Sequence, residues 1–149
     1  MKKITTIAIS IALLVASALP AQARDTQLML SIDEGMQTPT ADTKLDGSVK
    51  FYFAGQKHPM VLKKMSSDVS NRKTNAFGKA DNVACNWAFL STLIAFQEKA
   101  KELGANAVIN MVSYYNQHEM ASDSQFECHA GAIMAGVAIK GDYAKVADK

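Results

Sequence analysis

The sequence lacks the short motifs that mark most nucleotide-binding proteins and many hydrolases. It has no G-x-x-x-x-G-K-[ST] phosphate-binding loop, because Gly78-Lys79 has no glycine at the required earlier position. It has no G-x-S-x-G nucleophile elbow and no H-E-x-x-H zinc motif, since His118-Glu119 is not followed by a second histidine. We therefore expect a protein that is not an enzyme and binds no nucleotide or other cofactor.

The sequence also lacks a long hydrophobic run after residue 23. A helix needs about 20 mostly apolar residues to span a bilayer, and no later segment reaches this length. We therefore expect no membrane insertion of the chain beyond that point.

The first 23 residues have the pattern of a secretory signal peptide. Lys2 and Lys3 precede a mostly apolar run over 4–19, which is followed by the A-x-A site Ala21-Gln22-Ala23. We expect cleavage after Ala23 and export of residues 24–149, most simply to a bacterial periplasm. No cysteine lies beside this site, so we do not expect a lipid-modified N-terminus.

Residues 24–149 have no excess charge of either sign. The sequence contains 16 Lys and Arg and 14 Asp and Glu; two lysines belong to the signal peptide, which leaves 14 of each. No stripe of basic residues with interleaved aromatics is present, so we expect no nucleic-acid partner. Removing 23 of the 149 residues leaves 126, the size of a single domain with one core.

Cysteine is scarce, and its two copies predict a disulfide. In an oxidising compartment an even pair such as Cys85 and Cys128 favours a bridge. It would close a loop of about 44 residues and stabilise the fold by about 4 kcal/mol in the chain-entropy model. The alternative is a free reactive pair, although the two cysteines do not form a C-x-x-C motif.

Alternating apolar residues predict short strands in both halves of the chain. We expect 49–53 and 60–65 to form a hairpin, and the polar segments 34–48 and 66–81 to be exposed loops. Further strands are predicted on the same grounds, the last of them long and mostly buried. These are 26–33, 107–115 and 126–140.

The most regular pattern predicts a long amphipathic helix over 82–103. Apolar residues such as Phe89, Leu93 and Phe96 recur every three or four positions, and Trp87 widens their stripe. Asp81 or Asn82 is the expected N-cap, Cys85 lies in the first turn, and Gly104 ends the helix. We therefore predict an α+β fold, with an antiparallel sheet of four or five strands packed on this helix and held by one disulfide.

Two segments carry a resemblance to a known family. The A-N-A-V run at 105–108 follows the helix, and the Cys-bearing segment ECHAGAIMAGVAIKG covers 127–141. Together they resemble the YbjQ-like family and its secreted relatives and, more distantly, the signalling domain of the RcsF-like stress sensors. The match spans about 85–141, and it implies a small α/β domain over 24–149 in which disulfides stabilise the exported members.

The resemblance also carries functional implications. YbjQ-like proteins form cyclic pentamers, and some carry a heavy-metal-binding label. Some secreted relatives are named excinuclease ATPase subunit, but this chain has no phosphate-binding loop to match that name. It also departs from the RcsF pattern, because it has no lipid-accepting cysteine and only one possible bridge.

The segment ECHAG, 127–131, is the densest cluster of reactive side chains. In a strand Glu127 and His129 share one face while Cys128 takes the other, so the three do not converge on one ion. A metal site would need His129 with His118, Glu119 or Glu127 from across the hairpin.

Two functions follow from these observations. The first is a non-enzymatic periplasmic protein-interaction module in an envelope-stress role. Its expected partner is another envelope protein or a second copy of the chain. The second is a periplasmic heavy-metal-binding or thiol-redox protein that uses His118, His129 and Cys85.

Overall fold

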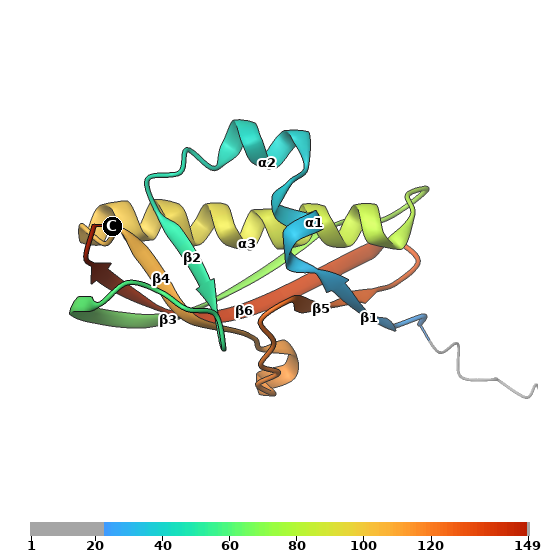
Figure 1. Ribbon diagram of the computed structural model, residues 1–149. Coiled ribbons are helices and arrows are strands. Elements are labelled where there is room, and N and C mark those ends of the chain that lie inside the picture. The colour runs from blue at the N-terminus through green and yellow to red at the C-terminus, as the bar shows by residue number, and fades with distance from the viewer. Residues whose placement is uncertain (1–22, 149) are drawn as a thin grey trace, which may run out of the picture.

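The computed structural model describes residues 23–148, within which six strands form one mixed sheet (Figure 1). Helix α3 (Asp81–Leu103) lies across one face of this sheet. The predicted mixture of a sheet, one main helix and a disulfide is confirmed. The predicted four or five antiparallel strands were wrong, because there are six and one pair is parallel. Apart from Ala23, the predicted signal peptide lies outside the described residues.

Strand β6 (Met134–Val146) is the centre of the sheet. One of its edges pairs antiparallel with β3 (Val61–Asn75) along nearly its whole length. The other edge is shared by two strands, β5 at the start of β6 and β4 farther along, both antiparallel. Beyond them, β1 pairs antiparallel with β5 and β2 pairs parallel with β4. The bounds are β1 (Thr26–Ser31), β2 (Lys50–Phe53), β4 (Ala107–Ser113) and β5 (Gln125–Ala130).

Strand β3 corrects two predictions. The predicted loop 66–81 is wrong over most of its length, because residues up to Asn75 continue the strand that begins at Val61. The predicted hairpin of 49–53 with 60–65 is also wrong, since β2 pairs with β4 and β3 with β6. β3 is an edge strand with mostly exposed side chains, so backbone pairing and not apolar alternation holds it in place.

The predicted long strand 126–140 is two strands. The chain turns over 131–133 between β5 and β6, and the Gly131 N–H donates to the Met134 carbonyl at 2.7 Å. Gly131 therefore lies in the turn of a hairpin. An added Cβ at Gly131 would lie 3.0 Å from the Arg24 carbonyl oxygen, so the turn passes close to the N-terminal segment.

The predicted loop 34–48 contains two short helices, α1 (Ile32–Met36) and α2 (Pro39–Lys44). Both begin at a side chain that caps the backbone: Ser31 accepts from the Glu34 N–H, and Thr38 accepts from the Ala41 N–H. The S-x-x-E spacing and the proline after Thr38 are helix-start signals. The polar composition of the segment predicted a loop in spite of these two signals.

The long helix is confirmed, with one correction at its start. Its N-cap is Ala80, which makes no side-chain cap, so the predicted capping by Asp81 or Asn82 is wrong. Asp81 instead lies in the first turn, where a negative charge is favourable, and pairs with Arg24. At the other end Gly104 has φ 71° and donates to the carbonyls of Ala100 and Lys101, as predicted.

The core lies between α3 and the sheet and includes two aromatic pairs among its aliphatic side chains. The rings of Phe89 and Phe126 stack with their centroids 4.0 Å apart, and Phe96 packs against Tyr143 at 5.7 Å. Gly141 of β6 sits under this layer. A Cβ there would lie only 2.7 Å from Val108 Cγ1, so the absence of a side chain lets β4 and β6 pack closely.

We expect Gly141→Ala to lower the free energy of unfolding by about 1–3 kcal/mol through overpacking. Gly136→Ala in the same strand is the matched control, since its Cβ would meet its nearest atom, Lys73 Cγ, at 3.5 Å, an ordinary contact. Urea denaturation of both variants measures the difference. Equal stability of the two variants would contradict the close packing described at Gly141.

Candidate functional site

The predicted bridge between Cys85 and Cys128 is present, with the two sulfur atoms 2.03 Å apart. Cys85 is the fifth residue of α3, slightly deeper in the helix than the predicted first turn. Both residues are 0% exposed and belong to the core cluster. The bond therefore fastens the beginning of α3 to β5, and neither sulfur is free to act as a nucleophile or metal ligand.

Glu127 and His129 lie on the other side of the sheet, as the alternation predicted, whereas Ala130 is buried in the core with Cys128. The His129 ring is held between two carboxylates: its Nδ1 is 2.9 Å from Asp25 Oδ1, and its Nε2 is 2.8 Å from Glu127 Oε1. Gln27 Nε2 donates to the same Glu127 oxygen at 3.0 Å. The Tyr115 ring stacks on the imidazole, with centroids 3.4 Å apart and planes within 6°. We call these five residues the His129 clamp.

The His129 clamp joins three segments that are far apart in the chain. Asp25 and Gln27 come from β1 and the residue before it, Glu127 and His129 from β5, and Tyr115 from the 3-10 turn after β4. Burial, together with the negative charges of Asp25 and Glu127, raises the pKa of the Tyr115 hydroxyl above its ordinary value. The clamp therefore fastens the N-terminal strand to the sheet.

The clamp does not have the geometry of a metal centre. Its two carboxylates meet different nitrogens of the imidazole, on opposite sides of the ring, so they do not converge on one point. Within residues 23–148, His118 and His129 belong to no group of three or more side chains that could hold a metal ion. The geometry therefore offers no support for the predicted alternative of metal binding through His118 and His129.

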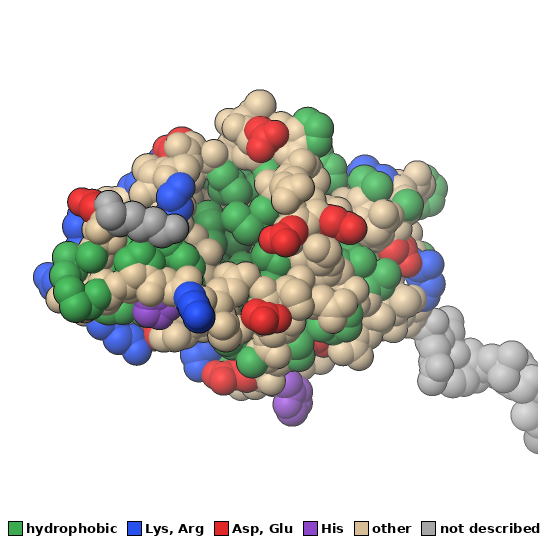
Figure 2. All heavy atoms as spheres, in the orientation of Figure 1, with side chains coloured by type: hydrophobic (Ala, Val, Ile, Leu, Met, Phe, Trp, Pro, Cys, Tyr) green, Lys and Arg blue, Asp and Glu red, His purple; other side chains and the backbone are tan. Residues whose placement is uncertain are grey.

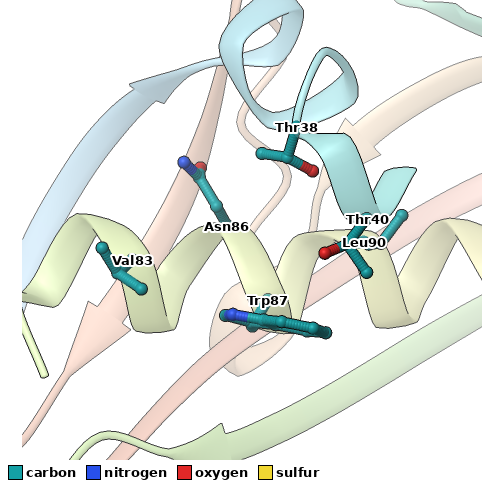
Figure 3. A pocket seen from close by; sticks show the side chains of 6 residues that line it. All are labelled: Thr38, Thr40, Val83, Asn86, Trp87 and Leu90. Carbon is teal, nitrogen blue, oxygen red and sulfur yellow. The ribbon is translucent and has the colours of Figure 1, made fainter. Parts of the chain in front are cut away.

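A separate groove lies on the outer side of α3, where α2 approaches it (Figure 3). We call it the α3 groove; its volume is about 120 Å³. Val83 and Trp87 are 45% and 46% exposed along it, whereas Leu90 is buried at its floor. Six side chains line it: Thr38, Thr40, Val83, Asn86, Trp87 and Leu90.

Asn86 is the polar feature of the α3 groove. Its side chain extends from α3 toward Thr38 (Figure 3). Its Oδ1 is buried and has no hydrogen-bond partner in the described structure. A buried amide oxygen without a donor is costly, and such atoms in folded proteins are usually satisfied. A ligand with an N–H or O–H group would supply the missing donor.

The position of Trp87 corrects a sequence prediction. Its spacing placed it at the margin of the core stripe, yet nearly half of the residue is exposed. At 100° per residue, Trp87 lies about 160° around the helix from Phe89 and about 180° from Phe96. A helical wheel therefore separates Trp87 from the core side chains, and this was the signal that could have located the groove.

Apolar side chains also reach the surface elsewhere. A hollow of about 210 Å³ lies between the end of α1 and β2, lined by residues that include Met36, Leu45 and Phe51. Figure 2 shows hydrophobic side chains gathered in the middle of the face below α2, with charged groups around them. Unlike the α3 groove, this hollow is lined by no buried polar side-chain atom that lacks a partner.

A scan against protein-family models, a search of curated proteins and a search of solved structures found no match to this chain. The resemblance to YbjQ-like and RcsF-like proteins therefore stays a prediction. No helix within residues 23–148 is long and apolar enough to cross a membrane.

Reduction of the disulfide is expected to lower the free energy of unfolding by about 4 kcal/mol, because the bridge restricts a loop of about 44 residues in the unfolded chain. The measurement compares urea denaturation with and without reductant. As a control, intact-mass analysis after alkylation in denaturant is expected to count no thiols in unreduced protein and two in reduced protein. Two alkylated thiols in unreduced protein would contradict the bridge.

We expect His129→Ala to destabilise the fold by about 1–3 kcal/mol, because it leaves the nearly buried Glu127 carboxylate without its closest donor. His118→Ala is the matched control, since His118 is exposed. Thermal denaturation followed by circular dichroism distinguishes the two variants. A His129 variant as stable as the His118 variant would show that the clamp contributes nothing to the attachment of β1.

Proposed function

We propose that this protein is an exported, non-enzymatic module that binds another protein through the α3 groove. One observation carries the proposal: a half-exposed tryptophan lies beside a buried amide oxygen that has no partner. Tryptophan is among the residues that most often dominate the energy of protein–protein interfaces.

The size and chemistry of the α3 groove favour a polypeptide as its occupant. Pockets for small ligands and cofactors usually measure about 300–1,000 Å³, whereas this groove measures about 120 Å³, room for one side chain. Val83 and Trp87 offer apolar surface, and Asn86 Oδ1 accepts one hydrogen bond. An apolar side chain next to a backbone N–H fits both requirements.

The attachment of α3 supports its use as a binding surface. Interfaces built on rigid elements lose less conformational entropy on binding. The disulfide at Cys85 and the packing of Phe89 hold the groove-forming half of α3 against the sheet. A disulfide also suits an oxidising compartment, which agrees with the predicted export.

The resemblance to RcsF-like proteins suggests that this binding serves a role in envelope stress. The expected partner is another exported protein, and a second copy of this chain is the other predicted occupant. The predicted metal-binding or thiol-redox function has no observation in its favour within residues 23–148, because the sulfurs are bonded in the core and the histidines there belong to no group of three or more possible metal ligands.

The protein has one tryptophan, so its fluorescence reports directly on the α3 groove. A photo-reactive amino acid placed at position 87 in the native host is expected to give one discrete adduct, whose partner is identified by mass. The same amino acid at position 77 is the control, because Phe77 is exposed but lies outside the groove. Equal adducts at both positions would contradict the proposal.

Binding of the purified partner is then expected to shift the Trp87 emission to shorter wavelength and protect it from acrylamide. Trp87→Ala is expected to weaken the binding measured by calorimetry by about 2 kcal/mol or more, whereas Phe77→Ala leaves it unchanged. Light scattering distinguishes a partner from self-association. A partner that binds without altering Trp87 emission would show that the groove is not its site.

A further inference from the structure

Strand β3 presents a long unpaired edge. It is 15 residues long, and within residues 23–148 it pairs only with β6. The Ala76 N–H donates to the Ile133 carbonyl at 2.9 Å, so position 76 faces β6. Because backbone groups alternate in an antiparallel ladder, the odd-numbered residues direct their N–H and C=O groups to the free side. These are Ser67, Val69, Asn71, Lys73 and Asn75.

A hollow of about 450 Å³ runs beside this edge, between β3 and α3. Ser70 and Arg72 lie on the β3 side of it, and Ala95 and Lys99 on the α3 side. The Ser70 hydroxyl oxygen is buried there without a hydrogen-bond partner. A strand added to β3 would place every second side chain in this hollow, within reach of that hydroxyl.

The charge of β3 indicates the kind of strand that fits. It carries four cations and one anion, Asp68. The Asp68 carboxylate already accepts hydrogen bonds from the Tyr143 hydroxyl and the Val69 N–H. Lys64 is paired with Asp142 at 3.0 Å, which leaves three cations against one anion. The edge is therefore still basic, and opposite charges across paired strands are stabilising. The four cations are Lys63, Lys64, Arg72 and Lys73.

The same charges oppose pairing with a second copy of the chain. In a full-length antiparallel pair of two β3 strands, residue i faces residue 136 − i. Lys63 then faces Lys73, Lys64 faces Arg72, and Asp68 faces its own copy, so every charged residue meets a like charge. Like charges directly opposite each other are destabilising, and natural edge strands use them to prevent self-association.

We propose that the free edge of β3 binds an extended acidic segment of a partner protein by strand addition. The backbone groups of Ser67, Asn71 and Lys73 supply the hydrogen bonds, because the Val69 N–H already donates to Asp68 Oδ1 and the Asn75 carbonyl already accepts from Lys79 Nζ. The basic side chains select the acidic segment. Every second side chain of that segment enters the hollow against α3. This binding mode uses a surface other than the α3 groove, so it is tested separately.

A blocked peptide of alternating Glu and Val, about eight residues long, serves as the probe, and a Lys/Val peptide is its matched control. The acidic peptide is expected to bind in calorimetry, with an affinity that falls as salt is added, and to slow amide hydrogen exchange at 67, 71 and 73. Binding of the Lys/Val peptide with equal affinity, or no binding of the acidic peptide, would overturn the proposal.

Two variants separate strand addition from simple charge attraction. Asn71→Pro removes one outward N–H without removing a bond to β6, and it is expected to weaken binding about tenfold, whereas Asn71→Val retains the N–H and binds normally. The double variant Arg72→Glu, Lys73→Glu is expected to weaken binding of the acidic peptide by about tenfold or more, because it reverses two of the charges that attract the peptide.

An acidic peptide N-methylated on the residues that face β3 tests the same bonds on unaltered protein, so the result does not depend on the folding of the proline variant. It is expected not to bind. Equal binding of the methylated and unmethylated peptides would show charge attraction without strand addition and would overturn the proposal.

Discussion

The bond between Cys85 and Cys128 joins the two layers of the molecule, and the assignment of side chains to faces follows from it. Because Cys128 points into the core to meet α3, its neighbours in β5 must point the other way. This orientation buries the stacked Phe89 and Phe126 next to the bridge. It also leaves Glu127 and His129 on the open face, where they form the clamp with residues of β1.

Helix α3 serves the fold and the candidate site with different sides. The side that carries Phe89, Leu93 and Phe96 is buried against β6 and β3. Val83 and Trp87, which project from another side, remain about half exposed beside α2. An apolar side chain on a helix contributes to the core only if it points toward a packed sheet or helix. An apolar side chain that points elsewhere stays exposed and is available for binding.

The sheet protects its edges by different means. The β1 edge lies beside the clamp, whereas β3 carries mostly exposed side chains and basic residues toward both of its ends. Charge is a recognised defence of an edge strand against pairing with its own copies. This charge leaves the backbone groups of the edge available to a segment of opposite charge. An edge strand that resists self-association can therefore still pair with a partner of opposite charge.

The sequence alone determined the helix from about 82 to 103 with its Gly104 end, the opposite facing of Cys128 and its neighbours, and the disulfide. It also determined the strands predicted at 26–33 and 107–115, each of which ends two residues earlier in the structure. These depend on spacing, capping and cysteine pairing, which neighbouring residues decide. Only the tertiary structure decided that 66–75 is a strand, that 131–133 is a turn, that Trp87 is exposed and that Asp25 and Tyr115 hold His129. Each of these features depends on residues that are distant in the chain. An edge strand is held by the backbone of its partner strand, and the exposure of a side chain depends on which other elements pack against it.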